Sequence, residues 1–200
     1  MKINIFLSSS SDYLENERNK FRNIISNIQK AFEGRCELSS YLWEYDASAI
    51  QKGSVKFQDS INKDLEDADI VVFIFCTRKG EHTNEEWEFV KNKDIRKVVF
   101  QKEWYAKLSS LTNAEINEFI KLTDFCKEIK NNGTLLVNIE NSEQFEIELT
   151  RHLLLTIPHI IKEKEKVKEI EKQDFKNFFE EQFEQWLKNN NKNHLTPAKI

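Results

Sequence analysis

Hydrophobic positions along the chain follow two alternating spacings. Short, nearly continuous apolar runs predict five strands, at residues 3–8, 36–45, 69–75, 97–102 and 134–140. Apolar residues three or four positions apart predict five helices between and after them, at residues 11–32, 54–68, 83–92, 113–131 and 142–157. Such strand–helix alternation favours right-handed crossovers, and it predicts an α/β fold with a doubly wound, five-stranded parallel sheet over residues 1–158.

The character of the sequence changes after Pro158. Residues 159–190 predict a helical extension that is first charged and then amphipathic, and residues 191–200 predict a disordered tail. The apolar side chains of the helical extension follow helical spacing: Phe175, Phe178, Phe179, Phe183, Trp186 and Leu187. This stripe can pack on the domain's own surface, self-associate or bind a partner protein. Membrane binding is disfavoured, because the polar face is as acidic as it is basic.

Composition narrows the classes of protein. A net charge of -4 with 32% charged residues argues against direct nucleic-acid binding. No apolar run approaches the ~20 residues of a membrane span, and the chain opens in a strand without a signal peptide, so we expect a cytoplasmic protein. Cys36, Cys76 and Cys126 are scattered and odd in number, which fits neither a disulfide framework nor a metal site.

Several common chemistries lack their motifs. The turn after the first strand is SSSSD instead of a glycine-rich dinucleotide loop, and the sequence has no phosphate loop ending in Gly-Lys-Ser/Thr. The third strand ends in Phe75, Cys76 and Thr77, where a phosphoacceptor receiver needs an acidic residue. A serine elbow between glycines is missing, and the four histidines have no metal-ligand spacing. These absences leave two possibilities at the carboxyl edge of the sheet: a reaction that uses carboxylates, or no reaction at all.

The segment RKGEHTNEEWEF at 78–89 follows the third strand, and the loops at this edge are where ligands bind in open α/β sheets. It carries Glu85, Glu86 and Glu88 at the start of a helix, for which Thr83 is the expected N-cap. Acidic residues also suit a helix N-terminus because they complement its dipole. Two interpretations therefore remain. One of these carboxylates faces a cleft above the sheet, or the carboxylates only complement the helix dipole.

The opening segment FLSSSSDYLENER resembles the start of bacterial TIR-like (Toll/interleukin-1 receptor-like) domains, which open with Ser-Ser-Thr, Asp-Leu and Glu-Arg motifs. In FLSSSSDYLENER, Ser8 and Ser9 match the serine pair, and Ser10 stands in place of the threonine. Leu14, Glu17 and Arg18 also match the opening, whereas Tyr13 replaces the usual aspartate.

The resemblance continues through the middle of the chain, to about residue 95 by motif and 157 by element order. FQDSIN resembles the family's Gln-x-x-Ile-Asn helix, and DADIVVFIFCTRKG resembles its Asp-Ile strand closing in Arg-x-Gly. Thr83 and Glu86 match its Thr-x-x-Glu pattern, although Glu81 and His82 replace the Ser-Gly that often precedes it.

The resemblance implies a flavodoxin-like TIR fold and NAD⁺ glycohydrolase activity, with NAD⁺ as the substrate. No bound cofactor and no metal are expected, because the sequence lacks the motifs for both. The resemblance also implies cleavage of the nicotinamide–ribose bond, with Glu86 as the catalytic residue, and a role in antiphage defence. Such cleavage builds positive charge on the ribose, which a neighbouring carboxylate stabilises. Thr83 and Glu86 are three residues apart and so share one helix face, whereas Glu85 and Glu88 face solvent.

Other residues are candidates for holding the substrate, each with a structural alternative. Ser8 and Ser9 can offer donors to the pyrophosphate, or the serines can simply cap the first helix. Arg78 can clamp a phosphate or remain a solvated loop residue. Trp43, with Tyr45, can stack on a flat ring or belong to the core.

Two other functions remain open at this stage. The first is a non-catalytic interaction module that assembles a complex through the sheet edge and the phenylalanine-rich extension. The second is a nucleoside deoxyribosyltransferase-like enzyme, because such enzymes place a carboxylate similarly.

Overall fold

The computed structural model describes residues 1–9, 13–42, 57–104 and 111–191, with the backbone alone at 57–60 and 186–191. Within these residues five parallel strands form one sheet in the order β2-β1-β3-β4-β5. The strands are β1 (Lys2–Ser9), β2 (Glu37–Leu42), β3 (Ile70–Phe75), β4 (Arg96–Lys102) and β5 (Leu136–Ile139). The predicted doubly wound, five-stranded parallel sheet is therefore confirmed, and its strand order is flavodoxin-like.

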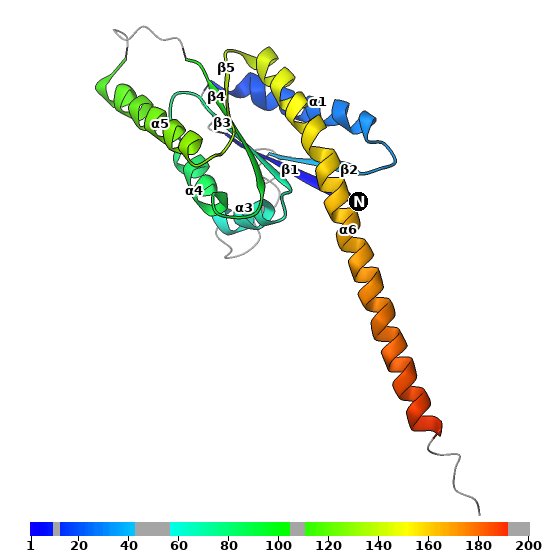
Figure 1. The fold of residues 1–200 in the computed structure, drawn as a ribbon. Helices are drawn as coiled ribbons and strands as arrows, with labels where there is room; N and C mark the ends of the chain where they lie inside the picture. The colour runs from blue at the N-terminus through cyan, green and yellow to red at the C-terminus, as the bar shows by residue number, and fades with distance from the viewer. Residues whose placement is uncertain (10–12, 43–56, 105–110, 192–200) are drawn as a thin grey trace, which may run out of the picture. The chain divides into compact units, whose positions relative to one another are not determined.

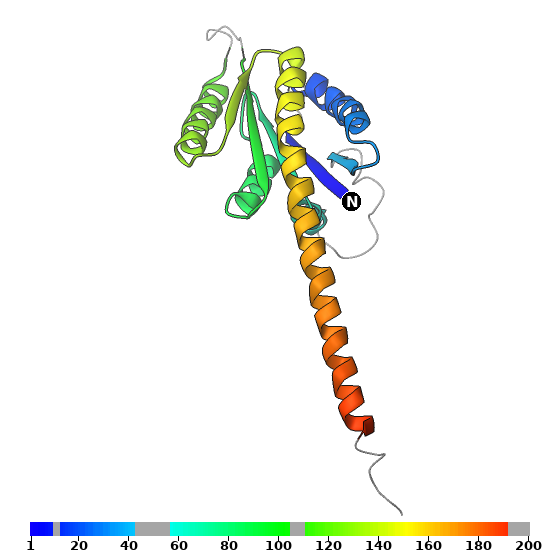
Figure 2. The same cartoon turned by 45° about the vertical axis from the view of Figure 1, so that its right-hand side comes forward.

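Helices cover both faces of this sheet (Figure 1). They are α1 (Glu15–Ala31), α3 (Phe57–Glu66), α4 (Glu81–Val90), α5 (Asn113–Asn131) and α6 (Ser142–Asn191). Figure 2 shows α1 and the first part of α6 on one face and α3, α4 and α5 on the other. The helices α1, α3, α4 and α5 each connect one parallel strand to the next, and such connections are right-handed. The carboxyl ends of all five strands consequently lie at one edge.

Two helices begin at residues other than predicted, and α6 continues to Asn191 past the predicted end at residue 157. Helix α1 begins at Glu15, four residues later than predicted, and its N-cap Leu14 makes no side-chain capping bond. Helix α4 begins at Glu81 after Gly80, so the predicted N-cap role of Thr83 is wrong. The reason is the backbone of Gly80, whose φ of 71° lies in the left-handed region that glycine adopts without strain. The turn at Gly80 starts the helix two residues before Thr83.

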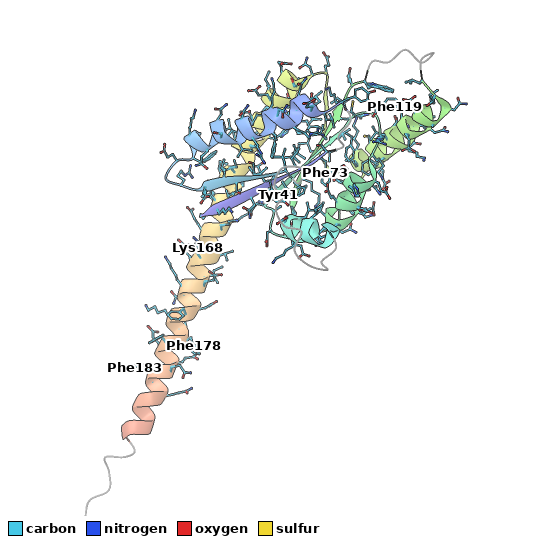
Figure 3. All side chains as sticks on the ribbon, turned by 180° about the vertical axis from the view of Figure 1, so that it is seen from behind. Tyr41, Phe73, Phe119, Lys168, Phe178 and Phe183 are labelled. Atoms are coloured by element: carbon cyan, nitrogen blue, oxygen red, sulfur yellow. The ribbon has the colours of Figure 1, made fainter. Side chains whose placement is uncertain are left out.

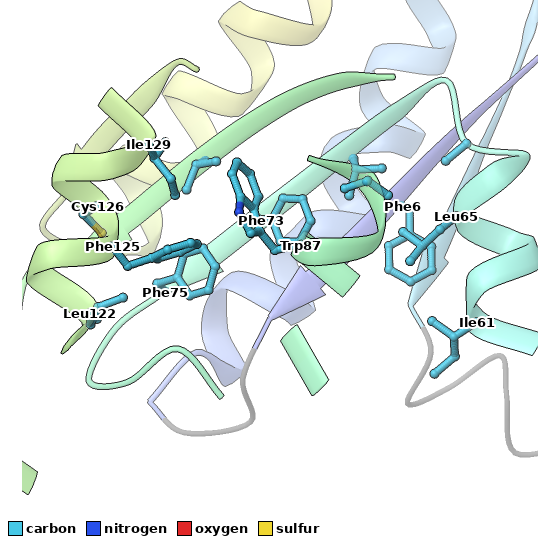
Figure 4. Packing of buried hydrophobic residues seen from close by; sticks show 14 residues of the cluster. Phe6, Ile61, Leu65, Phe73, Phe75, Trp87, Leu122, Phe125, Cys126 and Ile129 are labelled. Carbon is cyan, nitrogen blue, oxygen red and sulfur yellow. The ribbon is translucent and has the colours of Figure 1, made fainter. Parts of the chain in front are cut away.

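Aromatic packing fixes α4 against the sheet. Every residue of β3 is buried, as expected for a central parallel strand covered on both faces. The Trp87 ring meets the edge of Phe73 at 5.2 Å between centroids and of Phe125 at 5.5 Å, and Phe125 meets Phe75 at 5.2 Å. Figure 4 shows these four side chains together between α4, α5 and the sheet. Trp87 thereby sets the position of the neighbouring residue Glu86.

The chain divides into two compact units, Met1–Ile157 and Pro158–Ile200, and α6 runs through the boundary with Pro158 inside it. The first unit contains the sheet and its covering helices. In the described part of the second unit the chain is helical up to Asn191. No helix in the described ranges combines the length and the apolar character that a bilayer crossing demands.

Candidate functional site

Glu86 is the centre of the candidate site. Its side chain is 1% exposed, although it lies in the second turn of a surface helix. The hydroxyl of Ser8, on β1, donates a hydrogen bond to Oε2 of Glu86. The other carboxylate oxygen, Oε1, has no hydrogen-bond partner among the residues that the structure describes. One oxygen is thus bonded to the sheet, and the second is buried without a described partner.

Burial changes the protonation of this carboxyl group. Removal from water raises the pKa of Glu86 from 4.5 to about 7, because the charged form loses its hydration. The hydrogen bond from Ser8 and the nearby His82 act in the opposite direction, and Glu85 adds a smaller upward contribution. A carboxyl group that titrates near neutral pH is frequent in active sites, where it can exchange between its acid and base forms.

The neighbouring acidic residues have a different environment. The Glu85 and Glu88 side chains are each 49% exposed. Glu85 lies 3.5 Å from His82, and Glu88 forms an ion pair with Lys91 at 2.5 Å. The prediction that these two residues are solvated helix acids is confirmed. Glu86 is the one of the three that faces the interior.

The structure brings several predicted residues to this region. Thr83 is buried on the same face of α4 as Glu86, as their spacing predicted, and Ser9 is buried at the end of β1. Arg78 is exposed in the loop after β3. Trp43, together with Tyr45, lies outside the described residues, as do Ser10 and Ser11, so the stacking prediction and the capping alternative stay predictions.

A pocket of about 580 Å³ lies at the same edge of the sheet. Its described lining comes from the loops after β1, β3 and β4 and from the start of α5: Tyr13, Thr77, Arg78, Trp104, Ala114, Glu115 and Glu118. The rings of Tyr13 and Trp104 lie 6.2 Å apart. Arg78 therefore lines the pocket, whereas Glu86 is not among its described lining residues. The pocket and the buried carboxyl group are separate features of one edge.

A buried ion pair, which the sequence did not predict, supports this edge. Nζ of Lys102, the last residue of β4, lies 3.0 Å from Oε1 and 3.2 Å from Oε2 of the fully buried Glu17 on α1. The same ammonium group donates to the backbone carbonyl of Tyr13 at 2.9 Å. Tyr13 has a φ of 60°, an unusual conformation for a residue other than glycine. Lys102 thus holds together β4, α1 and the loop after β1.

Within the described ranges, no three His, Cys, Asp or Glu side chains gather closely enough to hold a metal ion. The sheet edge offers hydroxyl, carboxyl, guanidinium and aromatic groups. These groups suit a polar organic ligand with a flat ring.

Comparisons with known proteins add information on the fold alone. No family model and no curated protein matches the chain. Translation elongation factor SelB from Methanococcus maripaludis is 13% identical, with a TM-score of 0.43 over 78% of this chain and 34% of that chain. The chain thus spans about a third of that factor's length.

Two smaller proteins also match at low identity. A conserved protein from Enterococcus faecalis is 10% identical, with a TM-score of 0.45 over 76% of this chain and 100% of that one. A putative quinone reductase from Klebsiella pneumoniae is 12% identical, with a TM-score of 0.42 over 78% of this chain and 85% of that one.

Proposed function

We propose that the chain is a TIR-like NAD⁺ glycohydrolase that cleaves the nicotinamide–ribose bond and that Glu86 is its catalytic residue. The observation that carries the proposal is the burial of Glu86 at the carboxyl edge of the sheet, with Oε2 bound by Ser8 and Oε1 without a described partner. A buried carboxyl group of this kind costs stability, and such costs concentrate at functional sites.

The reaction needs little from the protein beyond position and charge. The C1′–N bond breaks, and its electron pair leaves with the ring nitrogen of nicotinamide, which is already a pyridinium in NAD⁺. The ribose carries positive charge in the transition state, and the Glu86 carboxylate stabilises it or accepts hydrogen bonds from its hydroxyls. Water then adds to C1′ and loses a proton, which gives ADP-ribose, nicotinamide and H⁺. The charged form of Glu86 is the active one.

Surrounding residues have supporting roles in the proposal. The hydrogen bond from Ser8 orients the carboxylate and favours its charged form. Arg78, at the pocket wall, provides a cation for the pyrophosphate, and the Tyr13–Trp104 pair provides flat apolar surface beside it. Thr83, Ser9 and Trp43 remain candidate substrate contacts. The three cysteines, all within the described residues, are not in disulfides, which is consistent with a reducing cytoplasm, where we place the activity.

A role as a bacterial defence effector is part of the same proposal and rests on the TIR-like motifs alone. One observation favours a second function, a non-catalytic interaction module: Glu86 is not among the described residues that line the pocket. A carboxyl group without access to the pocket would only connect α4 to β1 through its hydrogen bond with Ser8.

The experiment that separates these functions follows which compound is consumed. The purified chain is incubated with NAD⁺, with and without a crowding agent, and nicotinamide release is measured by liquid chromatography. A parallel reaction contains a deoxynucleoside and a free base. The proposal expects nicotinamide release. Base exchange without nicotinamide release would indicate the deoxyribosyltransferase-like alternative, and no consumption under any condition would indicate the interaction module.

A further inference from the structure

Tyr13 is an exposed aromatic residue in an unusual backbone conformation. It lies between β1 and α1, and its side chain is 64% exposed. Its φ of 60° is left-handed, and this conformation costs free energy in a residue that carries a side chain. Such conformations persist where the surrounding structure holds them, and they are frequent at ligand sites. The contacts that hold Tyr13 therefore bear on the ligand site beside it.

A buried ion pair holds the backbone of Tyr13. Nζ of Lys102 donates a hydrogen bond to the carbonyl oxygen of Tyr13 at 2.9 Å. The same nitrogen lies 3.0 Å from Oε1 of Glu17, whose side chain is fully buried, and the Lys102 side chain is only 19% exposed. Separating the two charges would leave a buried carboxylate without its cation, which is strongly destabilising. The carbonyl of Tyr13 is thus bonded to a donor of fixed position.

The backbone conformation places the Tyr13 ring at the wall of the pocket of about 580 Å³. The ring centroid of Tyr13 lies 6.2 Å from that of Trp104, and both residues line the pocket. Trp104 has a second ring neighbour, Phe119 of α5 (Figure 3), with centroids 6.0 Å apart. Among the described residues Tyr13 has Trp104 alone as a ring neighbour, so the position of its ring depends on the backbone. Because a change of φ turns the Cα–Cβ bond, another conformation would move the ring away from Trp104.

We propose that Lys102, fixed by Glu17, is a positioning residue for ligand binding in this pocket. Its hydrogen bond keeps Tyr13 left-handed, so that the Tyr13 and Trp104 rings stay together as one aromatic wall for a flat ring of the ligand. Lys102 is not among the described residues that line the pocket, so it acts through Tyr13. The position of the Tyr13 ring is a property of the chain alone, whereas NAD⁺ as the ligand rests on the proposed function.

Two uncharged pairs test this role: Glu17→Leu with Lys102→Met, and Glu17→Gln with Lys102→Met. Lys102→Met by itself would leave Glu17 as an unpaired buried charge and would lose stability for that reason, whereas replacing both charges is often tolerated. Lys20→Met is the control, because Lys20 also joins α1 to another element, through Glu143 and Glu146 of α6 at 3.1 and 2.9 Å. Circular dichroism verifies that each variant is folded and unfolds cooperatively on heating.

The first measurement is the nuclear Overhauser effect between the ring protons of Tyr13 and the indole protons of Trp104, in the absence of any ligand. The wild type and Lys20→Met should show this cross-peak, because the two rings are neighbours. The uncharged pairs should lose most of its intensity, because the carbonyl of Tyr13 no longer has its donor. An unchanged cross-peak in the uncharged pairs would overturn the proposal, and so would its absence in the wild type.

The second measurement is the kinetics of nicotinamide release from NAD⁺. The uncharged pairs and Tyr13→Ala should each raise KM on the order of 10-fold, which is the usual effect of one aromatic stacking contact, and should leave kcat nearly unchanged. Tyr13→Ala added to an uncharged pair should raise KM no further, because both changes remove the same wall. A further rise would show that Lys102 meets the ligand itself, since it lines a second pocket of about 300 Å³ that Trp104 also lines, and would overturn the proposal.

The positioning role and the proposed function can fail separately. A wild type that releases no nicotinamide would contradict the proposed function, and the cross-peak would still decide whether Lys102 positions Tyr13. An active wild type whose cross-peak is unchanged in the uncharged pairs would contradict the positioning role alone.

Discussion

The buried carboxyl group of Glu86 should make the folded protein less stable as the pH rises from 4.5 to about 7. The pKa of Glu86 is about 7 in the native state against 4.5 for an ordinary glutamate, so between these values the native state holds a proton that the unfolded state has lost. Stability falls with increasing pH wherever the native state binds more protons. The loss of folding stability is therefore absent below pH 4.5 and complete above pH 7.

The size of the effect follows from the two pKa values. Each pKa unit corresponds to roughly 1.4 kcal/mol, so raising the pKa from 4.5 to about 7 destabilises the charged native state by about 3 kcal/mol. Glu86→Gln removes the titration, and its stability relative to wild type should increase by nearly this amount between pH 5 and pH 8. In a domain of this size the change corresponds to roughly 6–12 °C in Tm.

Urea unfolding of both proteins at pH 5 and pH 8 measures this difference. In Glu86→Gln the buried amide lowers the stability by the same amount at both pH values, so this cost cancels when the two are compared. Glu88→Gln is the control, because its side chain is half exposed and pairs with Lys91, and its effect should be within about 1 kcal/mol at both pH values. An equal loss of stability in Glu86→Gln at pH 5 and pH 8 would refute the reasoning.

Three further predictions concern single residues. Ser8→Ala should raise the pKa of Glu86 further, because the hydrogen bond that lowers it is lost, and a carbon-13 NMR titration of the carboxyl group measures the change. Lys102→Met should cost roughly 3–5 kcal/mol in urea unfolding, because it leaves the fully buried Glu17 without its cation. Adding Glu17→Gln should recover most of that loss, and an unchanged loss in the double variant would argue against the ion pair. Gly133→Ala should cost about 1 kcal/mol in the same assay, since φ is +76° and nothing lies within 4 Å of the added carbon; a neutral result would show that the backbone relaxes there.

The sheet and its order of elements were predictable because local signals and the fold agree. The apolar run of β3 is typical of a central strand, and α5 ends at Asn131 as predicted, directly before the turn at the left-handed Gly133. The start of α4 was less predictable, because a threonine before a helical run and a glycine three residues earlier are both plausible starts. The backbone at Gly80 decided between them.

The candidate site was only partly predictable. The spacing of Thr83 and Glu86 correctly placed both on one buried face, while the contact between Glu86 and Ser8 joins residues 78 positions apart. Glu17 and Lys102 are 85 positions apart, and no local pattern distinguishes them from solvated charges. Such pairs depend on which strands become neighbours and on the facing of each helix. Those relations follow from the assembled sheet and not from any single segment.

Nicotinamide release from NAD⁺ by the wild type, Glu86→Gln and Glu88→Gln tests the central claim most directly. The account predicts wild-type activity that rises with pH through about 7, as the Glu86 carboxyl group becomes charged. Glu88→Gln should keep this activity, and Glu86→Gln should lose on the order of 10²–10³ in rate. Wild-type turnover in Glu86→Gln would contradict the account, and so would activity that falls as the pH rises through 7.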